Sequence, residues 1–341
     1  MSLRPDTRTF LQEHLDLFCC PRCGGDLVQS SEELACSPCN ARFAFDGNIP
    51  LLFAPNDWDA SSEDVTDRVK EFYEETPFPN YDDFDDVGSL VEKARKGHFA
   101  KQLDDQIPSG TLILECGCGT GQVSNFLSIA NRTVFGADIC LNSLRLAQEF
   151  KERNALGRVG FVQMNLFRPA FKPGIFDLVF CNGVLHHTSD PRRAFRSIAR
   201  LVRPNGYVLI GLYHRFGRLI TDLRRQIFRL SGDRFQSLDP NLRRDDSAKE
   251  KRRAWFMDQY KHPHESKHTL GEALQWFEEA GFSFVKSIPR SVPFQPFSPD
   301  ENLFEPERLG SAFERLLVEA GMTFSGSGEG GFFVFVGRRE P

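Results

Sequence analysis

The sequence predicts an α/β protein in which a mostly parallel sheet with an antiparallel last strand carries helices on both faces, preceded by a small β-rich cysteine module. Strand-like and helix-like stretches alternate from residue 106 to residue 213, as in successive βαβ units. A glycine-rich turn stands between the first strand and the next helix, at the edge where parallel sheets bind ligands. Two Cys-x-x-Cys pairs within the first forty residues predict the cysteine module.

Composition sets broad limits on the class of protein. The chain has 341 residues, of which 40% are hydrophobic and 26% charged, so it is long enough for two domains and wholesale disorder is excluded. No stretch approaches about 18 uninterrupted apolar residues, and the first residues lack the apolar run of a signal peptide. We therefore expect a cytoplasmic protein without a transmembrane segment.

The N-terminal cysteines have the spacing of a metal site. Cys20 and Cys23 form one pair, Cys36 and Cys39 form a second, and 12 residues separate the pairs. Each pair places two thiolates on a tight turn, and four sulfur ligands make a closed tetrahedral site, which is typical of structural zinc rather than catalytic zinc. A disulfide is disfavoured in the cytosol. Cys19 could replace Cys20 sterically, but Cys20 matches the spacing of the other pair.

Alternating apolar residues around Asp46 and Gly47 predict a hairpin after the second cysteine pair. The Cys-Pro-x-Cys pair and the Phe-x-x-x-Gly-x-Ile-Pro ending resemble the Trm112-like zinc-ribbon family over roughly residues 13–54. We expect this zinc ribbon to span residues 1–56. The resemblance also implies that the ribbon is a possible surface for a protein partner.

The glycine-rich turn follows an apolar run at 111–114 and reads Glu115-Cys116-Gly117-Cys118-Gly119-Thr120-Gly121, with a helix predicted from Val123. Glycines there let the backbone approach a ligand without a clash from Cβ. The next predicted strand ends on Asp138, whose carboxylate could accept both hydroxyls of a ribose. The alternative is that Asp138 only caps the next helix.

Further strands are predicted at 133–138, 160–164, 176–180 and 207–212, and helices at 143–154 and 192–202. The glycine turn, Asp138, Phe-Asp-Leu-Val at 176–179, Val-Leu-His-His at 184–187 and Leu-Val-Arg-Pro-Asn-Gly at 201–206 resemble class I S-adenosylmethionine-dependent methyltransferases. The resemblance covers roughly residues 106–213. It implies a Rossmann-like sheet that ends in two antiparallel strands.

The resemblance assigns cofactor contacts residue by residue. The turn would wrap the methionine part of S-adenosylmethionine, through Gly117, Cys118, Gly119 and Gly121. Glu115 would support that turn and Asp138 would hold the ribose. The remaining contacts would be Ile139 against the adenine, Asn165 near its amino group and Asn182 beside the sulfonium. Many family members have Asp at the position of Asn165; an amide could accept the same N–H and also donate to a ring nitrogen.

Catalytic residues are less clearly indicated. Methyl transfer is an in-line displacement that mainly needs positioning and desolvation, with a general base if the acceptor is an alcohol or phenol. His186, His187 and Tyr213 follow strands at the expected edge and are candidates for a base or a substrate contact. The alternative is that the histidines cap a helix or bond to backbone, and that Tyr213 is an ordinary loop residue. No Asn/Asp-Pro-Pro-Tyr motif is present, which favours oxygen or carbon acceptors over planar nitrogens.

Three segments fall outside the family pattern. An acidic stretch at 57–105 is predicted to be a linker or a lid over the cofactor, with Tyr73, Phe78 and Tyr81 as its aromatic candidates. The methyltransferase domain, at 106–341, carries insertions at about 215–268 and 290–329. The first contains a helical repeat whose apolar side should pack on the core while Arg218, Arg225 and Arg229 face solvent, or form a surface for an anionic ligand.

The favoured function is therefore methyl transfer from S-adenosylmethionine to a small-molecule or carrier-bound acceptor. An RNA methyltransferase is the first alternative: the ribbon and the basic insertion favour it, while a net charge of -5 and the lack of a broad basic face oppose it. A non-catalytic protein that binds S-adenosylmethionine is the second alternative, against which the complete glycine turn and Asp138 argue.

Overall fold

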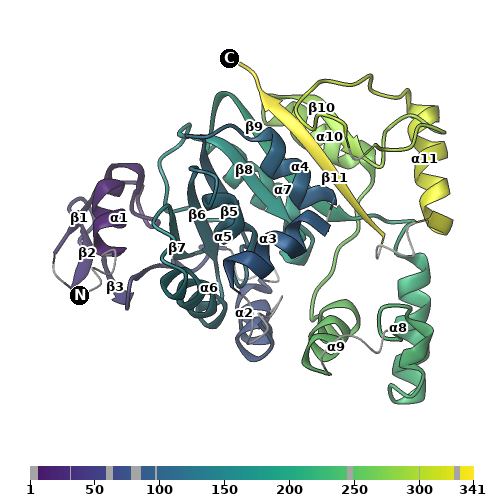
Figure 1. Ribbon diagram of the computed structural model, residues 1–341, viewed down its shortest axis with the longest axis horizontal. Coiled ribbons are helices and arrows are strands. Elements are labelled where there is room, and N and C mark those ends of the chain that lie inside the picture. The colour runs from purple at the N-terminus through teal and green to yellow at the C-terminus, as the bar shows by residue number, and fades with distance from the viewer. Residues whose placement is uncertain are drawn as a thin grey trace.

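The computed structural model describes residues 7–30, 32–58, 64–77, 86–96, 98–243, 249–298, 300–325 and 331–341 (Figure 1). Phe78 and Tyr81, two of the aromatic candidates in the acidic segment, lie outside these residues. None of the helices among the described residues is long and apolar enough to cross a membrane.

A parallel sheet forms the centre of the molecule and confirms the predicted fold class. Its strands run in the order β7-β6-β5-β8-β9, and two antiparallel strands then follow in the order β11-β10. The strands are β5 (Leu112–Cys116), β6 (Thr133–Asp138), β7 (Val159–Met164), β8 (Phe176–Asn182), β9 (Val202–Tyr213), β10 (Phe282–Ile288) and β11 (Phe332–Arg339). The predicted strand ranges agree closely with β5 to β8, whereas β9 begins at Val202 rather than at residue 207 and so takes the end of the segment predicted to be a helix.

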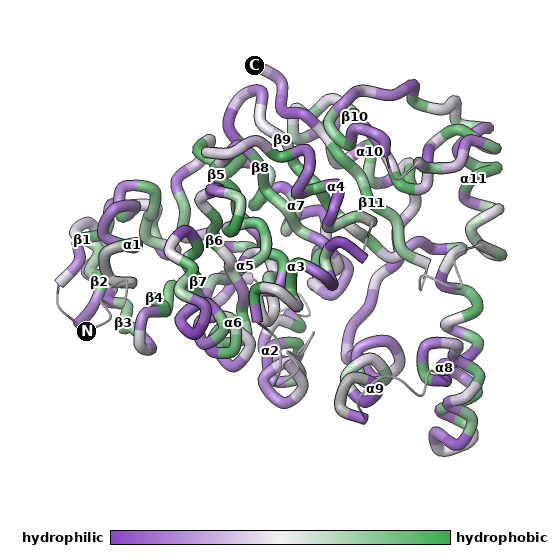
Figure 2. Tube along the Cα trace, in the orientation of Figure 1, coloured by the Kyte–Doolittle hydropathy of each residue, from purple (hydrophilic) through white to green (hydrophobic). Residues whose placement is uncertain are grey.

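Helices cover both faces of the sheet because successive strand residues point to opposite sides. Ile113 and Val134 belong to one buried cluster, whereas their neighbours Leu114 and Phe135 belong to the other. The first cluster includes residues of α4 (His98–Gln106), α5 (Gln122–Ser128) and α6 (Leu141–Arg153), and the second includes residues of α7 (Pro191–Ala199) and α10 (Leu270–Glu279). Hydrophobic residues are concentrated along the central strands (Figure 2).

The cysteine module consists of α1 (Thr7–Glu13), a short helix at Leu15–Leu17, and the strands β1 (Leu27–Gln29), β2 (Glu33–Cys36), β3 (Arg42–Asp46) and β4 (Ile49–Leu52). The predicted hairpin is confirmed, with Phe45 opposite Pro50. Beyond what the sequence predicts, β4 also pairs in parallel with β7, so that the module continues the large sheet. Phe18 and Leu34 of the module lie in the same buried cluster as Phe135 of the sheet. The module is therefore packed against the central domain rather than tethered to it.

The described parts of the acidic segment are helical: α2 (Thr66–Glu75), α3 (Val87–Lys96) and α4. The Glu74 carboxylate accepts hydrogen bonds from the backbone N–H groups of Leu141 and Asn142, at 2.8 and 3.0 Å. These donors belong to the first turn of α6, where a negative charge is favourable. Glu74 thus anchors α2 beside the carboxyl edge of the sheet.

The first insertion contains α8 (Leu219–Ser231), a short helix at Gln236–Leu238, α9 (Lys249–Phe256) and a π-helical turn at Met257–Lys261; the second contains α11 (Ala312–Ser325). A short helix at Leu185–His187 follows β8. Hydrophobic and hydrophilic residues alternate around α8, which projects from one end of the molecule together with α9 (Figure 2).

The expected orientation of the first insertion helix is wrong. Leu223 and Leu230 are 62% and 87% exposed, whereas Arg218 is fully buried and Arg225 is half-buried. The cause is Glu265, a buried carboxylate that pairs with Arg218 Nη2 at 2.6 Å and with Arg225 Nη2 at 2.8 Å. Because a buried charge must be paired, this carboxylate draws the arginine side of α8 inward. Arg229 alone of the three arginines is exposed, as expected.

Candidate functional site

A cavity of about 380 Å³ lies at the carboxyl ends of the parallel strands. Residues that follow β5, β6, β7, β8 and β9 all contribute to its wall, since parallel strands end at one edge of a sheet. Eleven residues named from the sequence line it: Tyr73, Glu115, Gly117, Cys118, Gly119, Asp138, Ile139, Asn165, Asn182, His187 and Tyr213. Gly121 and His186 are not part of the lining. The roles assigned to all of these residues stay predictions.

The glycine turn after β5 requires glycine at two positions. Gly117 and Gly121 have φ angles of 72° and 70°, a region that side chains disfavour. A Cβ on Gly117 would lie 2.2 Å from Cγ2 of Val184, and one on Gly121 would lie 2.6 Å from Cβ of Ala147. The turn therefore packs its backbone directly against neighbouring elements, and the N–H groups of Gly117 and Cys118 both donate to the carbonyl oxygen of Ala137 at the end of β6.

Two carboxylates stabilise that turn and the helix after it, Glu115 buried and Asp138 half-buried. Glu115, at the end of β5, accepts a hydrogen bond from the Ser124 hydroxyl of α5, and burial raises the pKa of Glu115 to about 8. Asp138, at the end of β6, accepts from the N–H of Gly119 and from the N–H of Cys140, each at 2.8 Å. Burial also raises the pKa of Asp138. The N–H of Ile139 also stabilises the ionised carboxylate, and three donors leave it one lone pair with which to accept from a ligand.

Asn165 lies after β7 and is held by the segment that leaves the cysteine module. Its Nδ2 atom donates to the carbonyl oxygen of Ala54 at 2.9 Å and to Oδ1 of Asn56 at 2.8 Å, while its Oδ1 atom accepts from the N–H of Phe167. Both amide hydrogens are engaged within the chain. Acceptance through the second lone pair of Oδ1 is the contact that Asn165 has left to offer a ligand.

Asn182 contributes an unsatisfied polar atom to the cavity. Its Oδ1 atom is buried and has no hydrogen-bond partner among the described residues. A Cβ on Gly211 of the adjacent strand would lie 1.9 Å from this oxygen, so glycine is required there. A buried acceptor without a partner is costly in a protein interior. Asn182 therefore fits a ligand that supplies a hydrogen-bond donor at the end of β8.

The histidines and Tyr213 form a stack beside the cavity. The His186 ring is fully buried, with ring centroids 4.2 Å from His187 and 3.9 Å from Tyr213. His187 Nδ1 lies 2.9 Å from the carbonyl oxygen of His264 and is the donor there; burial lowers the pKa of His187 to about 4. His187 is therefore neutral at pH 7, and its other ring nitrogen can only accept a hydrogen bond.

The lining also includes residues that the sequence analysis missed. Trp255, Asp258 and Gln259 come from the first insertion, and Phe332 comes from β11. Thr66 and Val69 of α2 join Tyr73, the aromatic candidate named from the acidic segment. No motif marks Asp258 or Gln259, because their position depends on how the insertion folds back over the sheet.

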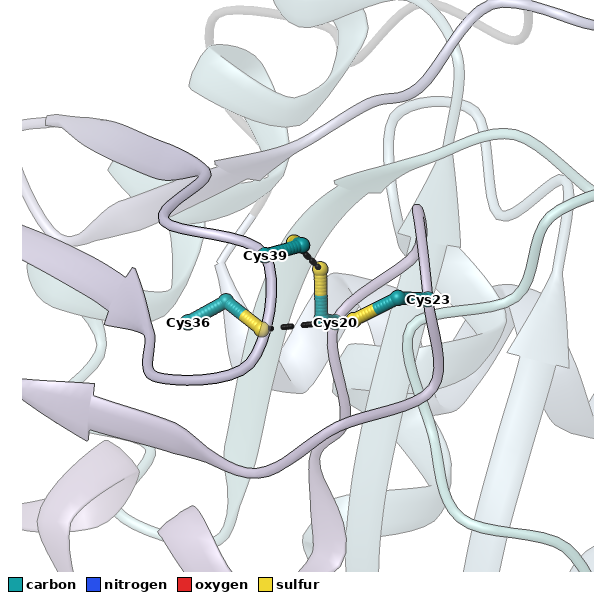
Figure 3. A group of neighbouring side chains, drawn as sticks. All are labelled: Cys20, Cys23, Cys36 and Cys39. Carbon is teal, nitrogen blue, oxygen red and sulfur yellow. Dashed lines mark hydrogen bonds between the residues drawn. The ribbon is translucent and has the colours of Figure 1, made fainter.

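The four predicted zinc ligands converge in the cysteine module, two from each Cys-x-x-Cys pair (Figure 3). Their sulfur atoms all lie within 4.8 Å of one another, with Cys20 3.6 Å from Cys39 and Cys23 3.4 Å from Cys36. Tetrahedral zinc with bonds of about 2.3 Å places sulfurs roughly 3.8 Å apart, so the cluster fits the ion. Cys19 instead points its sulfur toward the carbonyl oxygen of Pro169, 4.0 Å away, outside the cluster.

Part of the chain is similar in sequence to known proteins. Residues 114–210 match the family model described as a methyltransferase domain. The chain is 31% identical over 228 residues to an uncharacterised protein of Synechococcus, covering 60% of this chain and 52% of the relative. It is 32% identical over 108 residues to the ubiquinone biosynthesis O-methyltransferase of Ralstonia nicotianae, covering 31% of this chain and 45% of the relative. The chain thus spans about half the length of the curated relatives it matches.

Among solved structures, the chain is similar to one from a complex between the Haloferax volcanii Trm112 methyltransferase activator and a putative methyltransferase. The TM-score is 0.45 at 14% identity, covering 77% of this chain and 100% of the other.

Proposed function

We propose that the protein transfers a methyl group from S-adenosylmethionine to a small-molecule or carrier-bound acceptor, because residues 114–210 match the family model described as a methyltransferase domain. The observation that carries the proposal is the convergence of the glycine turn, Asp138 and Asn182 on one cavity at the carboxyl edge of the sheet. An unpaired acceptor, a glycine turn and a carboxylate together suit a ligand with an amine, a flexible chain and a ribose.

The strand order separates the cavity into two halves. Asp138, Ile139 and Asn165 lie at the ends of β6 and β7, on one side of β5, and these residues would hold the nucleoside. Asn182 and Tyr213 end β8 and β9, on the other side. When bound, S-adenosylmethionine supplies a methyl carbon already activated by a positive sulfur. The chain then has to hold the acceptor on the β8–β9 side and exclude water from it.

Oxygen is the acceptor atom we favour, since relatives such as the one from Ralstonia nicotianae are named O-methyltransferases. The β8–β9 side is lined by Tyr73, Trp255 and Phe332, which suits an apolar or aromatic acceptor body. Arg218 and Arg225 belong to the basic insertion, whose positive charge was the sequence argument for an RNA substrate. Both arginines pair with Glu265 inside the protein. That pairing removes part of the argument for an RNA substrate.

The cysteine module would hold zinc through Cys20, Cys23, Cys36 and Cys39, as a structural ion with no open coordination position. We also propose that its outer surface is available to a protein partner, as the resemblance to Trm112-like ribbons implies.

Titration calorimetry with S-adenosylhomocysteine tests the proposal. The parent should bind, and Asp138→Ala should weaken binding by about 10-fold or more, the value of hydrogen bonds to a charged group. Asp46→Ala is the matched control, because Asp46 pairs with Arg145 outside the cavity. Incubation of cell extract with labelled methyl donor and the parent should then give a labelled product. No binding would refute the proposal; binding without any transfer would favour a non-catalytic protein.

A further inference from the structure

The β8–β9 half of the cavity contains a hydrogen-bonded cluster that the cofactor roles do not use. Asp258 and Gln259 lie on the π-helical turn of the first insertion, Tyr213 ends β9, and Tyr73 comes from α2. All four line the cavity. Short π-helical turns are frequent at functional sites, since they displace one side chain from the regular helical path. Here the turn brings a carboxylate to the wall opposite the nucleoside half.

The orientation of this carboxylate is determined by a chain of hydrogen bonds that starts at Arg218. Arg218 donates to Oε1 of Gln259 at 2.6 Å, so the amide nitrogen of Gln259 faces the other way. That nitrogen donates to Oδ2 of Asp258 at 2.8 Å and to the hydroxyl of Tyr213 at 2.7 Å. The Tyr73 hydroxyl donates to Oδ1 of Asp258 at 2.9 Å. Each oxygen of Asp258 still has one lone pair for a substrate.

Three acidic residues line the cavity in the described part of the chain: Glu115, Asp138 and Asp258. The first two bind the glycine turn and its helix, so Asp258 is the acid that remains for the acceptor. The charged and titratable groups around it are Tyr73 of α2, Tyr213 of β9, Arg218 immediately before α8, and His262. Arg218 pairs with Glu265 at 2.6 Å, and its positive charge also acts to lower the pKa of Asp258.

We propose that Asp258 accepts the proton of a hydroxyl group on an uncharged aromatic acceptor, and that Tyr73 and Gln259 position its carboxylate. The proposal rests on the proposed methyl-transfer function and adds the substrate class and the base. Burial raises the pKa of Asp258, which makes it a better proton acceptor than an exposed aspartate. Tyr73, Trp255 and Phe332 provide the apolar and aromatic wall that such an acceptor needs.

The proposed step conserves charge and atoms. The acceptor O–H bond breaks and its proton passes to a free lone pair of Asp258. The acceptor oxygen forms the new bond to the methyl carbon, and the carbon–sulfur bond breaks with its electron pair going to sulfur. The products are an aryl methyl ether, S-adenosylhomocysteine and a neutral Asp258, which returns its proton to water when the product leaves.

The test measures transfer of labelled methyl groups to three neutral probes, phenol, catechol and naphthol, together with S-adenosylhomocysteine affinity by calorimetry. The parent should methylate at least one probe. Asp258→Asn should lower kcat by about 100-fold or more, as removal of a general base does, with unchanged affinity for S-adenosylhomocysteine. Asp222→Asn is the matched control: Asp222 lies in the same insertion and pairs with Lys267, but does not line the cavity.

The pH profile distinguishes a base from a structural residue. In the parent, kcat should fall as the pH drops through the pKa of Asp258, because the protonated acid cannot accept a proton. Tyr73→Phe removes one hydrogen bond that stabilises the ionised carboxylate, so this fall should begin at a higher pH. Because Tyr73→Phe keeps the aromatic ring, it still tests the role of Asp258 if Asp258→Asn fails to fold.

Three outcomes would overturn the assignment. Parental kcat in Asp258→Asn would exclude it as the base, and an unshifted profile in Tyr73→Phe would exclude the positioning role. Failure of the parent to methylate any probe while it binds S-adenosylhomocysteine would exclude the substrate class alone. Failure to bind S-adenosylhomocysteine would refute the underlying methyl-transfer function as well.

Discussion

Glu265→Gln should make the stability of the protein less dependent on pH. Glu265 is nearly inaccessible to solvent, and the guanidinium groups of Arg218 and Arg225 hold the pKa of its carboxyl at about 2, against an ordinary 4.5. Desolvation opposes this fall but is outweighed by the two arginines. The difference corresponds to about 3 kcal/mol of folding free energy.

The sign follows from the direction of the shift. Because the pKa is lower in the folded state, the stabilisation is fully present above about pH 4.5 and is lost as the pH falls toward 2. At pH 7 the free energy of unfolding of the variant should therefore be about 3 kcal/mol lower than that of the parent. This difference between variant and parent should disappear by about pH 2. Replacing one member of a buried pair also leaves Arg218 less compensated, which adds to the loss at neutral pH.

Urea titrations of parent and variant at several pH values measure the gap. Glu149→Gln, at an exposed position of α6, is the control and should leave the free energy of unfolding within about 0.5 kcal/mol of the parent. A gap between Glu265→Gln and the parent that stayed constant from pH 7 to pH 2 would refute the linkage to the buried carboxylate.

Two further predictions concern the cysteine module and the glycine turn. Zinc analysis should find one ion per chain in the parent, less in Cys36→Ser, and an unchanged amount in Cys19→Ser. Chelation should lower the melting temperature of the whole chain, because β4 of the module pairs with β7 of the sheet. Equal loss of zinc in both variants would contradict the assignment of the ligands. Gly117→Ala should weaken S-adenosylhomocysteine binding by about 10-fold or more, since the new Cβ would lie 2.2 Å from Val184. Gly157→Ala is the control in the calorimetry, because a Cβ there meets nothing within 4 Å. Equal affinities in both variants would show that the turn tolerates a side chain.

Local patterns were sufficient for several features of this protein. Strand–helix alternation predicted β5 to β9, because each strand is a short apolar run bounded by turn residues. The zinc ligands followed from spacing alone, since two residues between cysteines suit one tight turn. The glycine turn was recognisable because its position between a strand and a helix is itself local.

Long-range partners decided the rest. The apolar periodicity of α8 indicates an amphipathic helix but does not say which side is buried; Glu265, some forty residues further along the chain, turned the arginine side inward. The parallel pairing of β4 with β7 also joins distant parts of the chain. Asp258 is likewise placed in the cavity wall by a π-helical turn and oriented there by hydrogen bonds from Gln259 and Tyr73. Periodicity and spacing are properties of neighbouring residues, whereas burial of a charge depends on which distant group can pair with it.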